Sequence, residues 1–231
     1  MPTISAGRVG YIVGTGGSSF ATSRTANGSN AVDSPSTDFS SPIQSYYSSG
    51  RGGGTYRQSR TYIYFDTSGI IGTVTSATLK ITSYASTVTS DVIVMNGYNA
   101  FGGDGNTALN VDDFDEVGMG GTSQEFSSQF TPWVASTINS IPLTLNAFTR
   151  LVEDDDTVMG VMNYTNDQQN TAPTTSPYSV GACIAFGTTI TLEYALEQFS
   201  VNGVAYNASD KFNGTSFRNI KKIDGVLTPG G

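Results

Sequence analysis

The sequence contains no histidine, a single cysteine and only four lysines. Without histidine the chain cannot form a Ser-His-Asp triad or a His-ligated zinc site, and it lacks the commonest general base. Cys183 has no second cysteine for an internal disulfide, so we interpret it as a small buried apolar residue. These absences favour a protein that is not an enzyme and that needs no cofactor.

Charge of either sign is scarce. Only 13% of the residues are charged, against a usual value of about 25%, and the net charge is −8. Three of the four lysines, Lys211, Lys221 and Lys222, lie near the C-terminus. A nucleic-acid binder needs a basic face that neutralises phosphates, so we expect no nucleic-acid partner.

Long apolar runs are also missing. No run approaches the ~18 residues of a membrane span, and no apolar segment of the secretory type follows Met1. The polar residues are instead small hydroxyls, with 28 Ser and 30 Thr. A chain rich in Ser, Thr, Gly and Tyr, without an export signal or a membrane span, fits a virion assembled in the host cytoplasm.

The best-defined pattern lies in residues 60–81, RTYIYFDTSGIIGTVTSATLKI. A first strand-like segment ends at the turn formers DTSG, and in the second segment apolar and polar side chains alternate, which predicts one buried and one solvent-facing side. We expect Asp66 to form an ion pair with Arg60 that fixes the strand. The residues expected to carry the core are Arg60, Asp66, Leu79, Ile81 and Trp133.

Many short strand-like segments are separated by turn-forming residues, and no long segment repeats its apolar residues at the spacing of a helix. This pattern predicts an all-β antiparallel sandwich of the jelly-roll type. We divide the chain into an N-terminal extension with a first strand (1–34), the sandwich (35–197) and a C-terminal β-rich tail (198–231). Residues 33–58 are expected to form a loop, 130–141 one or two helical turns, and 153–156 an exposed hairpin tip. No helix is expected after the glycine-rich turn at residues 14–19.

The C-terminal tail repeats an apolar-Asx-Gly unit at a constant spacing of 11 residues. Asn-Gly and Asp-Gly are strong signals for two-residue hairpin turns, because both turn positions need a positive φ. One strand and one turn are too little to be stable alone, so each unit requires a neighbour. We therefore expect an assembly role for Val201, Asn202, Gly203, Phe212, Asn213, Gly214, Ile223, Asp224 and Gly225.

Two segments resemble known proteins. RTYIYFD from Arg60 and SATLKI from Ser76 resemble the opening of DNRLRE-type, carbohydrate-binding-module-like domains, and the likeness extends over residues 35–196. The resemblance implies a jelly-roll sandwich of a kind found in virion proteins of tailed phages. The usual second tryptophan upstream of Trp133 is missing, as is the proline that often opens the last strand, so sugar binding is not carried over. The tail resembles the "kiNGv" endings of many phage structural proteins.

Three kinds of ligand site remain open. Calcium prefers several loop oxygens, and three carboxylate clusters could supply them: residues 104–115, residues 153–156, and Asp66. The candidate ligands are Asp104, Asp112, Asp113 and Asp115, with a solvated acidic loop as the alternative. Tyr46 and Tyr47 are candidate glycan contacts, joined by Trp133 if that ring is exposed instead of forming part of the core. Hydrolysis of glycans needs two positioned carboxylates, and no motif places such a pair.

The function that we expect is therefore that of a non-enzymatic bacteriophage structural protein: a capsid decoration, head fibre or tail-associated subunit. Its expected partners are other virion proteins and further copies of itself. The alternative is a carbohydrate-binding module or adhesin that recognises a host surface glycan, and a glycan-cleaving enzyme is the third hypothesis.

Overall fold

The structure is a computed structural model. It describes residues 1–33, 43–51, 53–84, 90–115, 124–185 and 188–198, together with the backbone of the short strands beyond residue 198. The predicted fold class is confirmed, because two antiparallel sheets make up an all-β sandwich. The jelly-roll connectivity implied by the resemblance stays a prediction.

The smaller sheet has four strands in the order β1-β11-β6-β8. Strand β6 lies inside this sheet, and its buried residues alternate with more exposed ones, as the sequence pattern predicts. Leu79 and Ile81 point inward, whereas Lys80 between them forms an ion pair with Glu193 on β11. The strands are β1 (Thr3–Ser5), β6 (Val74–Thr82), β8 (Ile138–Pro142) and β11 (Thr191–Leu196).

The larger sheet has seven strands and is organised around β5, a strand of 14 residues. One edge of β5 pairs with β2; the other pairs first with β4 and then with β9, which in turn pairs with β7. The strands are β2 (Arg8–Gly14), β3 (Gly28–Asp33), β4 (Ile43–Gly50), β5 (Gly53–Asp66), β7 (Val92–Asn96), β9 (Asp156–Asn163) and β10 (Tyr178–Ala182).

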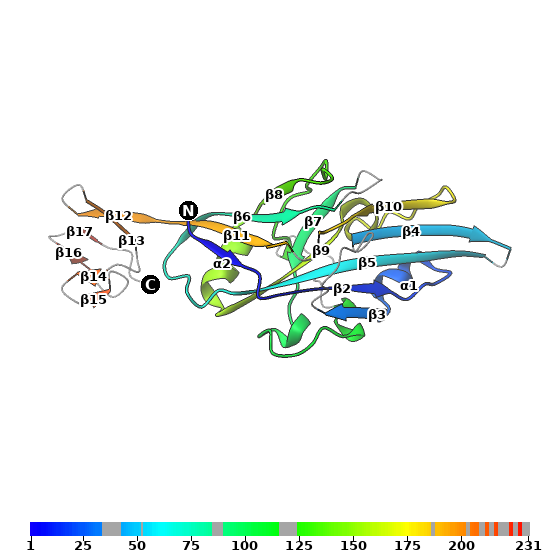
Figure 1. The fold of residues 1–231 in the computed structure, drawn as a ribbon, viewed down its shortest axis with the longest axis horizontal. Helices are drawn as coiled ribbons and strands as arrows, with labels where there is room; N and C mark the ends of the chain where they lie inside the picture. Colours follow the sequence, from blue (N-terminus) through cyan, green and yellow to red (C-terminus); the bar gives the residue numbers. More distant parts are fainter. Residues whose placement is uncertain are drawn as a thin grey trace.

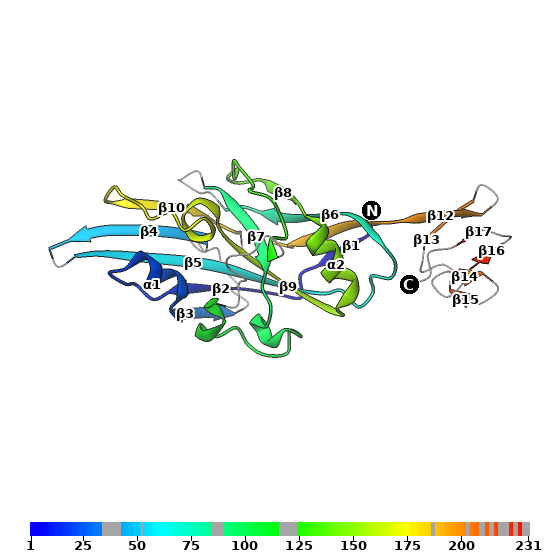
Figure 2. The same cartoon turned by 180° about the vertical axis from the view of Figure 1, so that it is seen from behind.

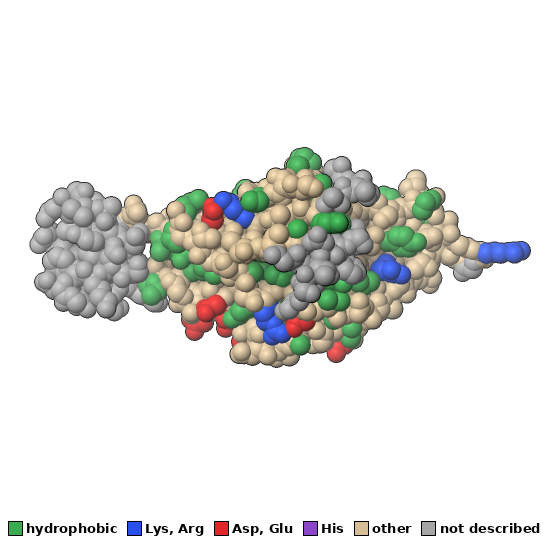
Figure 3. All heavy atoms as spheres, in the orientation of Figure 1, with side chains coloured by type: hydrophobic (Ala, Val, Ile, Leu, Met, Phe, Trp, Pro, Cys, Tyr) green, Lys and Arg blue, Asp and Glu red, His purple; other side chains and the backbone are tan. Residues whose placement is uncertain are grey.

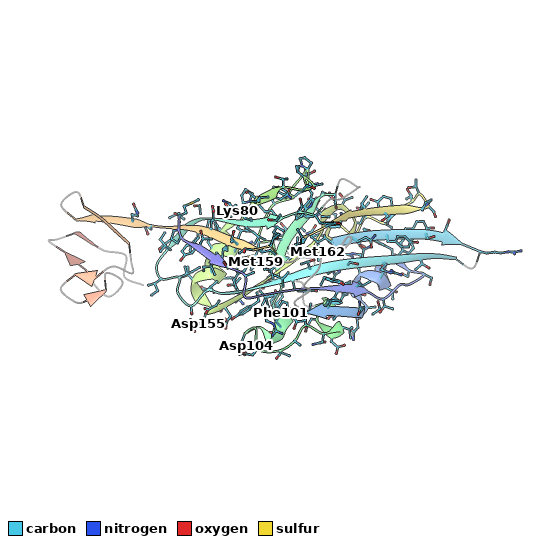
Figure 4. All side chains as sticks on the ribbon, viewed as in Figure 1. Lys80, Phe101, Asp104, Asp155, Met159 and Met162 are labelled. Atoms are coloured by element: carbon cyan, nitrogen blue, oxygen red, sulfur yellow. The ribbon has the colours of Figure 1, made fainter. Side chains whose placement is uncertain are left out.

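The central part of the larger sheet is buried on both faces. Its inner face packs against the smaller sheet in one apolar cluster, and its outer face supports a second cluster that includes Phe101 and Phe114. Met159 and Met162, three residues apart on β9, belong to different clusters because successive side chains of a strand alternate between faces (Figure 4). The sandwich therefore has a third layer of non-strand segments.

The segments of the third layer include helix α1 and three short helical turns, whereas helix α2 lies between the two sheets. The apolar side chains of helix α2 fill one end of the space between the sheets, with Ala147 and Leu151 fully buried. Helix α1 packs on β5, with Ser19 accepting a hydrogen bond from the Thr22 amide at its N-terminus. The elements are α1 (Phe20–Thr25), α2 (Leu145–Glu153), η1 (Ala100–Gly102), η2 (Val111–Asp115) and η4 (Tyr164–Gln168).

The N-terminal segment is part of the sandwich, which corrects the expectation of an extension. Strand β2 pairs with β5 on one side and β3 on the other, and β1 pairs with β11 of the smaller sheet. The predicted boundary at residue 34 therefore separates strands that share one sheet. The expectation of no helix after the glycine-rich turn is also wrong, since α1 follows it.

Three local expectations are wrong for identifiable reasons. Of the expected loop at residues 33–58, residues 34–42 lie outside the described residues, and residues 43–58 form β4 and the start of β5. Their backbone ladders and the stacked rings of Tyr47 and Tyr56 compensate for few apolar side chains. Residues 130–141 form no helix. The side chain of Asn139 accepts a hydrogen bond from the Val134 backbone N–H and donates one to the Val134 carbonyl, and β8 pairs with β6. Residues 153–156 join α2 to β9 instead of forming a hairpin tip.

Beyond β11 the chain forms three two-stranded hairpins, each a sheet of its own. Their pairings join the residues on either side of each Asx-Gly dipeptide: Val201 with Val204, Phe212 with Thr215, and Ile223 with Val226. The strands are β12 (Gln198–Val201), β13 (Val204–Asn207), β14 (Lys211–Phe212), β15 (Thr215–Ser216), β16 (Lys222–Ile223) and β17 (Val226–Leu227).

The molecule is elongated along its strands (Figure 1). The β4–β5 hairpin projects at one end, and the β12–β17 hairpins lie past the opposite end, as the reverse view confirms (Figure 2). Among the described residues, no helix combines the length and apolar character that crossing a membrane requires.

Candidate functional site

Arg60 is the centre of a buried polar network beneath the third layer. Its side chain is fully buried, and two of its nitrogens bind the Asp167 carboxylate at 2.7 Å each. The remaining donors bind the backbone oxygens of Phe114 and Arg24, and the guanidinium carbon lies 4.0 Å from the centre of the Phe114 ring. This network joins β5 to α1, η2 and η4.

Burial tends to lower the pKa of Arg60, but the adjacent Asp167 and Tyr62 outweigh it and the net direction is upward. Burial has the opposite effect on Tyr62 and raises the pKa of its hydroxyl, which donates to the Phe114 carbonyl. Arg60 therefore stays charged and Tyr62 stays neutral. The network therefore holds the third layer against β5.

Asp66 is not the partner of Arg60, and its expected core position is wrong. The two residues lie six positions apart on β5, about 20 Å at the usual rise per residue. Asp66 is exposed and accepts hydrogen bonds from the backbone and hydroxyl of Ser68. The actual partner, Asp167, lies in a polar segment that carried no sequence signal for a buried charge.

Trp133 and the two candidate glycan tyrosines do not form one surface. The Trp133 side chain lies in the apolar cluster between the sheets, 5% exposed. Tyr46 and Tyr47 alternate on β4; Tyr46 lies beside Arg57, and Tyr47 stacks on Tyr56 with ring centres 4.4 Å apart. The structure therefore does not bring the expected aromatic platform together.

The candidate calcium ligands are likewise dispersed among local hydrogen bonds. Asp104 accepts from Asn106, Asp112 accepts from the Asn27 side chain, and Asp113 accepts from the Asn110 amide. Burial raises the pKa of Asp113. Within the described ranges, no three carboxylate or cysteine side chains are grouped so as to hold a metal ion; Asp115 is exposed at the end of η2.

The expected assembly residues flank or occupy the C-terminal turns. The backbones of Val201, Phe212 and Ile223 are paired in the three hairpins. The Asx-Gly dipeptides themselves, Asn202-Gly203, Asn213-Gly214 and Asp224-Gly225, lie outside the described residues.

Two adjoining hollows form a polar groove where β7 ends and α2 meets β9. Their volumes are 350 and 250 Å³, and Asn96, Tyr98 and Arg150 line both. Glu153 and Asp154 to Asp156 line the larger hollow; Gln124, Asn146 and Thr149 complete the smaller one. Acidic atoms gather at this part of the surface (Figure 3), and Asp155 lies along the lower edge of the body (Figure 4). We call this feature the Tyr98 groove.

The walls of the Tyr98 groove are held in place by hydrogen bonds. The side-chain oxygen of Asn96 accepts from the Tyr98 amide at 3.0 Å, and the Gly97 amide donates to the Val158 carbonyl at 2.9 Å. Tyr98 has a positive φ of 45° and its side chain stays exposed. The sequence singled out the carboxylate cluster at residues 153–156 but not its neighbour Tyr98, although Asn96-Gly97 was an available turn signal directly before the exposed ring.

Two of the four groove carboxylates already have partners. Arg150 forms an ion pair with Asp154 at 2.7 Å, one helical turn apart, and the Tyr64 hydroxyl donates to Asp156. Burial and this hydrogen bond raise the pKa of Tyr64, so the hydroxyl remains a donor. The groove therefore presents fixed donors and acceptors around one aromatic ring.

No protein-family model matches the chain, and the search of curated proteins finds no match. The likeness to DNRLRE-type domains and to phage tail endings therefore stays a prediction.

Proposed function

We propose that the protein is a non-enzymatic structural subunit of a bacteriophage virion, assembling with further copies of itself and with other virion proteins through its C-terminal hairpins. The observation that carries this proposal is the series of three hairpins, each an independent two-stranded sheet, repeated every 11 residues after a complete sandwich. It favours a capsid decoration, head fibre or tail-associated subunit, with the hairpins as its attachment.

The physical reason is that an isolated two-stranded hairpin is at best marginally stable in water. Three such hairpins in succession leave their strand edges without further pairing in the described chain, and exposed edges are ready to pair with another chain. Copies of the tail that pair with one another, or with a neighbouring virion protein, satisfy those edges.

The body of the protein supports the same role. Its polar surface depends on serine and threonine hydroxyls more than on charge, and its elongated shape separates the tail from the far β4–β5 hairpin (Figure 1). A subunit attached by one end presents the rest of its sandwich to solvent.

The test is a full-length variant carrying Gly203→Val, Gly214→Val and Gly225→Val. A β-branched residue strongly disfavours the positive φ that the second position of a type I′ turn needs, so the hairpins lose their turns. We expect the unchanged protein to form an oligomer in light scattering and the variant to be monomeric. Gly69→Val is the matched control, because a Cβ at Gly69 meets open space.

An oligomer that survives the triple substitution, or a wild-type chain that is monomeric at all concentrations, would contradict assembly through the tail. The virion location is tested separately by negative-stain imaging of phage particles whose copies carry a C-terminal label. Particles without label at any fixed position would rule out the virion proposal.

A further inference from the structure

We infer that the C-terminal hairpins of one copy pair with the open edge of strand β8 on a neighbouring copy. This inference rests on the proposed function and deepens it, because it names the surface that receives the tail. The contact is heterologous: each copy gives its tail to one neighbour and receives the tail of another, which builds a ring or a filament.

Strand β8 is an edge strand of the smaller sheet, and only one side of its backbone is paired. The hydrogen bond from the Ser83 amide to the Thr137 carbonyl, 2.8 Å long, fixes which residues face β6. Such residues alternate in an antiparallel pair, so the N–H and C=O groups of Ile138 and Ser140 point away from β6. Within the described residues no strand pairs with this side of β8.

Exposed apolar side chains gather beside this open edge. The Ser83 hydroxyl donates to the carbonyls of Val134 and Thr137, at 2.5 and 3.1 Å, and so brings their neighbours together. Tyr84, Val134 and Ile138 are 41%, 50% and 59% exposed, and they are three of the six large apolar side chains that the described chain exposes. Apolar atoms reach the surface at the rim of the body over β8 (Figure 1, Figure 3). A docked strand therefore buries apolar surface in addition to pairing its backbone.

The edge of β8 lacks the features that usually protect an open strand. Charged side chains, a very short strand or a covering segment normally prevent pairing with another chain. No charged residue occurs in β8, and Pro142 removes a donor only at its C-terminal end. Lys80, which lies opposite Ser140 on β6, already forms an ion pair with Glu193.

The other edge strands are less suited to receive a strand. Strand β1 has only three residues, and the segments at Phe130 and Glu125 form bridges to β7. Strand β3 ends in Asp33, which is paired with Arg8. None of the large apolar side chains that the described chain exposes belongs to β10.

Charge complementarity identifies the tail of a neighbour as the occupant. The side chains of residues 198–231 carry four positive and two negative charges, whereas those of residues 1–197 carry seven positive and seventeen negative charges. The tail is therefore net +2 and the body net −10, so a tail is attracted to a body and repelled by another tail. Because the hairpins lie past the end of their own sandwich (Figure 1), the receiving body is that of another copy.

The tail also offers the matching backbone. Each hairpin is a two-stranded sheet of its own, and its strands include the apolar residues Val201, Phe212 or Ile223. An extended segment that adds to a sheet edge gains main-chain hydrogen bonds and side-chain contacts together. One tail strand added to β8 extends the four-stranded sheet and satisfies both edges.

The test is titration calorimetry of the full-length triple glycine variant, whose own tail lacks its turns, with a synthetic peptide of residues 198–231. We expect the peptide to bind. Ser140→Pro in the same background should weaken that binding about tenfold or more, because proline removes the outward N–H and its ring occupies the edge. The sheet tolerates this change, since the Ser140 N–H faces away from β6.

Ser5→Pro is the matched control for Ser140→Pro. The Ala6 amide bonds to the Ile190 carbonyl, so by alternation the amide of Ser5 faces away from β11, at the opposite edge of the same sheet. This variant should bind the peptide with unchanged affinity. Coinciding melting curves for the two proline variants exclude unfolding as the cause of any loss.

Ile138→Lys tests the same edge without changing its backbone. The lysine removes exposed apolar surface and repels the positive tail, so peptide binding should weaken about threefold or more. Leu145→Lys is its control, because Leu145 is also an exposed apolar side chain, at 73%, but lies on α2.

The inference is overturned if the peptide does not bind, or if Ser140→Pro and Ile138→Lys both leave its affinity unchanged. An unchanged protein that is oligomeric, with a monomeric triple variant that ignores the peptide, would leave assembly through the tail standing and remove β8 as its receiver. A triple variant that stays dimeric until Ser140→Pro is added would show β8 pairing with β8 of a second copy, which contradicts both proposals.

Discussion

Arg60 and Asp167 place opposite charges in a part of the protein from which water is excluded. A buried ion pair gains stability only when its geometry is good and its other donors are satisfied. Both conditions hold, since the pairing is bidentate and the remaining Arg60 donors reach backbone oxygens. Removing one partner therefore leaves a buried charge poorly compensated.

Arg60→Met is expected to lower the free energy of unfolding by about 3–5 kcal/mol, measured by urea denaturation. Glu193→Gln is the comparison, because it breaks the partly exposed pair with Lys80 and should cost about 0–1 kcal/mol. Equal losses in the two variants would show that the buried network does not hold the layers together.

The raised pKa of Asp113 makes the free energy of unfolding depend on pH. Burial raises its pKa above the ordinary 3.8, so the folded protein binds this proton more tightly than the unfolded chain does. The stabilisation from the protonated form is complete below pH 3.8 and is lost as the pH rises through the folded-state pKa. In Asp113→Asn that loss disappears.

The measurement is urea denaturation of both proteins at a series of pH values from about 3 to about 7. The stability of Asp113→Asn relative to the unchanged protein should rise with pH over the lower part of this range and then level off. A relative stability that falls with pH would mean that the buried carboxyl is favoured in its charged form.

At the scale of elements, the N-terminal strand β2 is an internal strand of the larger sheet. It lies between β5 and β3 in the larger sheet, and Ile12 on it is fully buried. Strand β1, by contrast, is a three-residue edge strand of the smaller sheet. The two segments should therefore tolerate truncation differently.

Deleting residues 1–14 is expected to abolish the cooperative melting transition, because β5 would lose the ladder along one edge. Deleting residues 1–5 should only lower the melting temperature. Circular dichroism checks both. A folded protein after the longer deletion would restore the view of this segment as an extension.

At the scale of the whole molecule, the two proposed contact surfaces occupy different regions. The tail hairpins lie past one end of the sandwich (Figure 2), and β8 lies at an edge of the body.

The sequence by itself determined the class of fold and the repeated hairpins. Alternating side chains in β6 and the Asx-Gly dipeptides are local signals, because strand period and turn geometry depend on neighbouring residues. The burial of Leu79, Ile81 and Trp133 follows from their apolar character in the same way.

Only the tertiary structure decided which distant residues meet. Arg60 and Asp167 are 107 positions apart, and neither segment carries a pattern that selects the other. Strand β4 forms from a serine-rich segment because β5 and β10 supply its hydrogen bonds. The Tyr98 groove likewise exists because the end of β7 and the start of β9 pack beside α2, and no local propensity specifies that meeting.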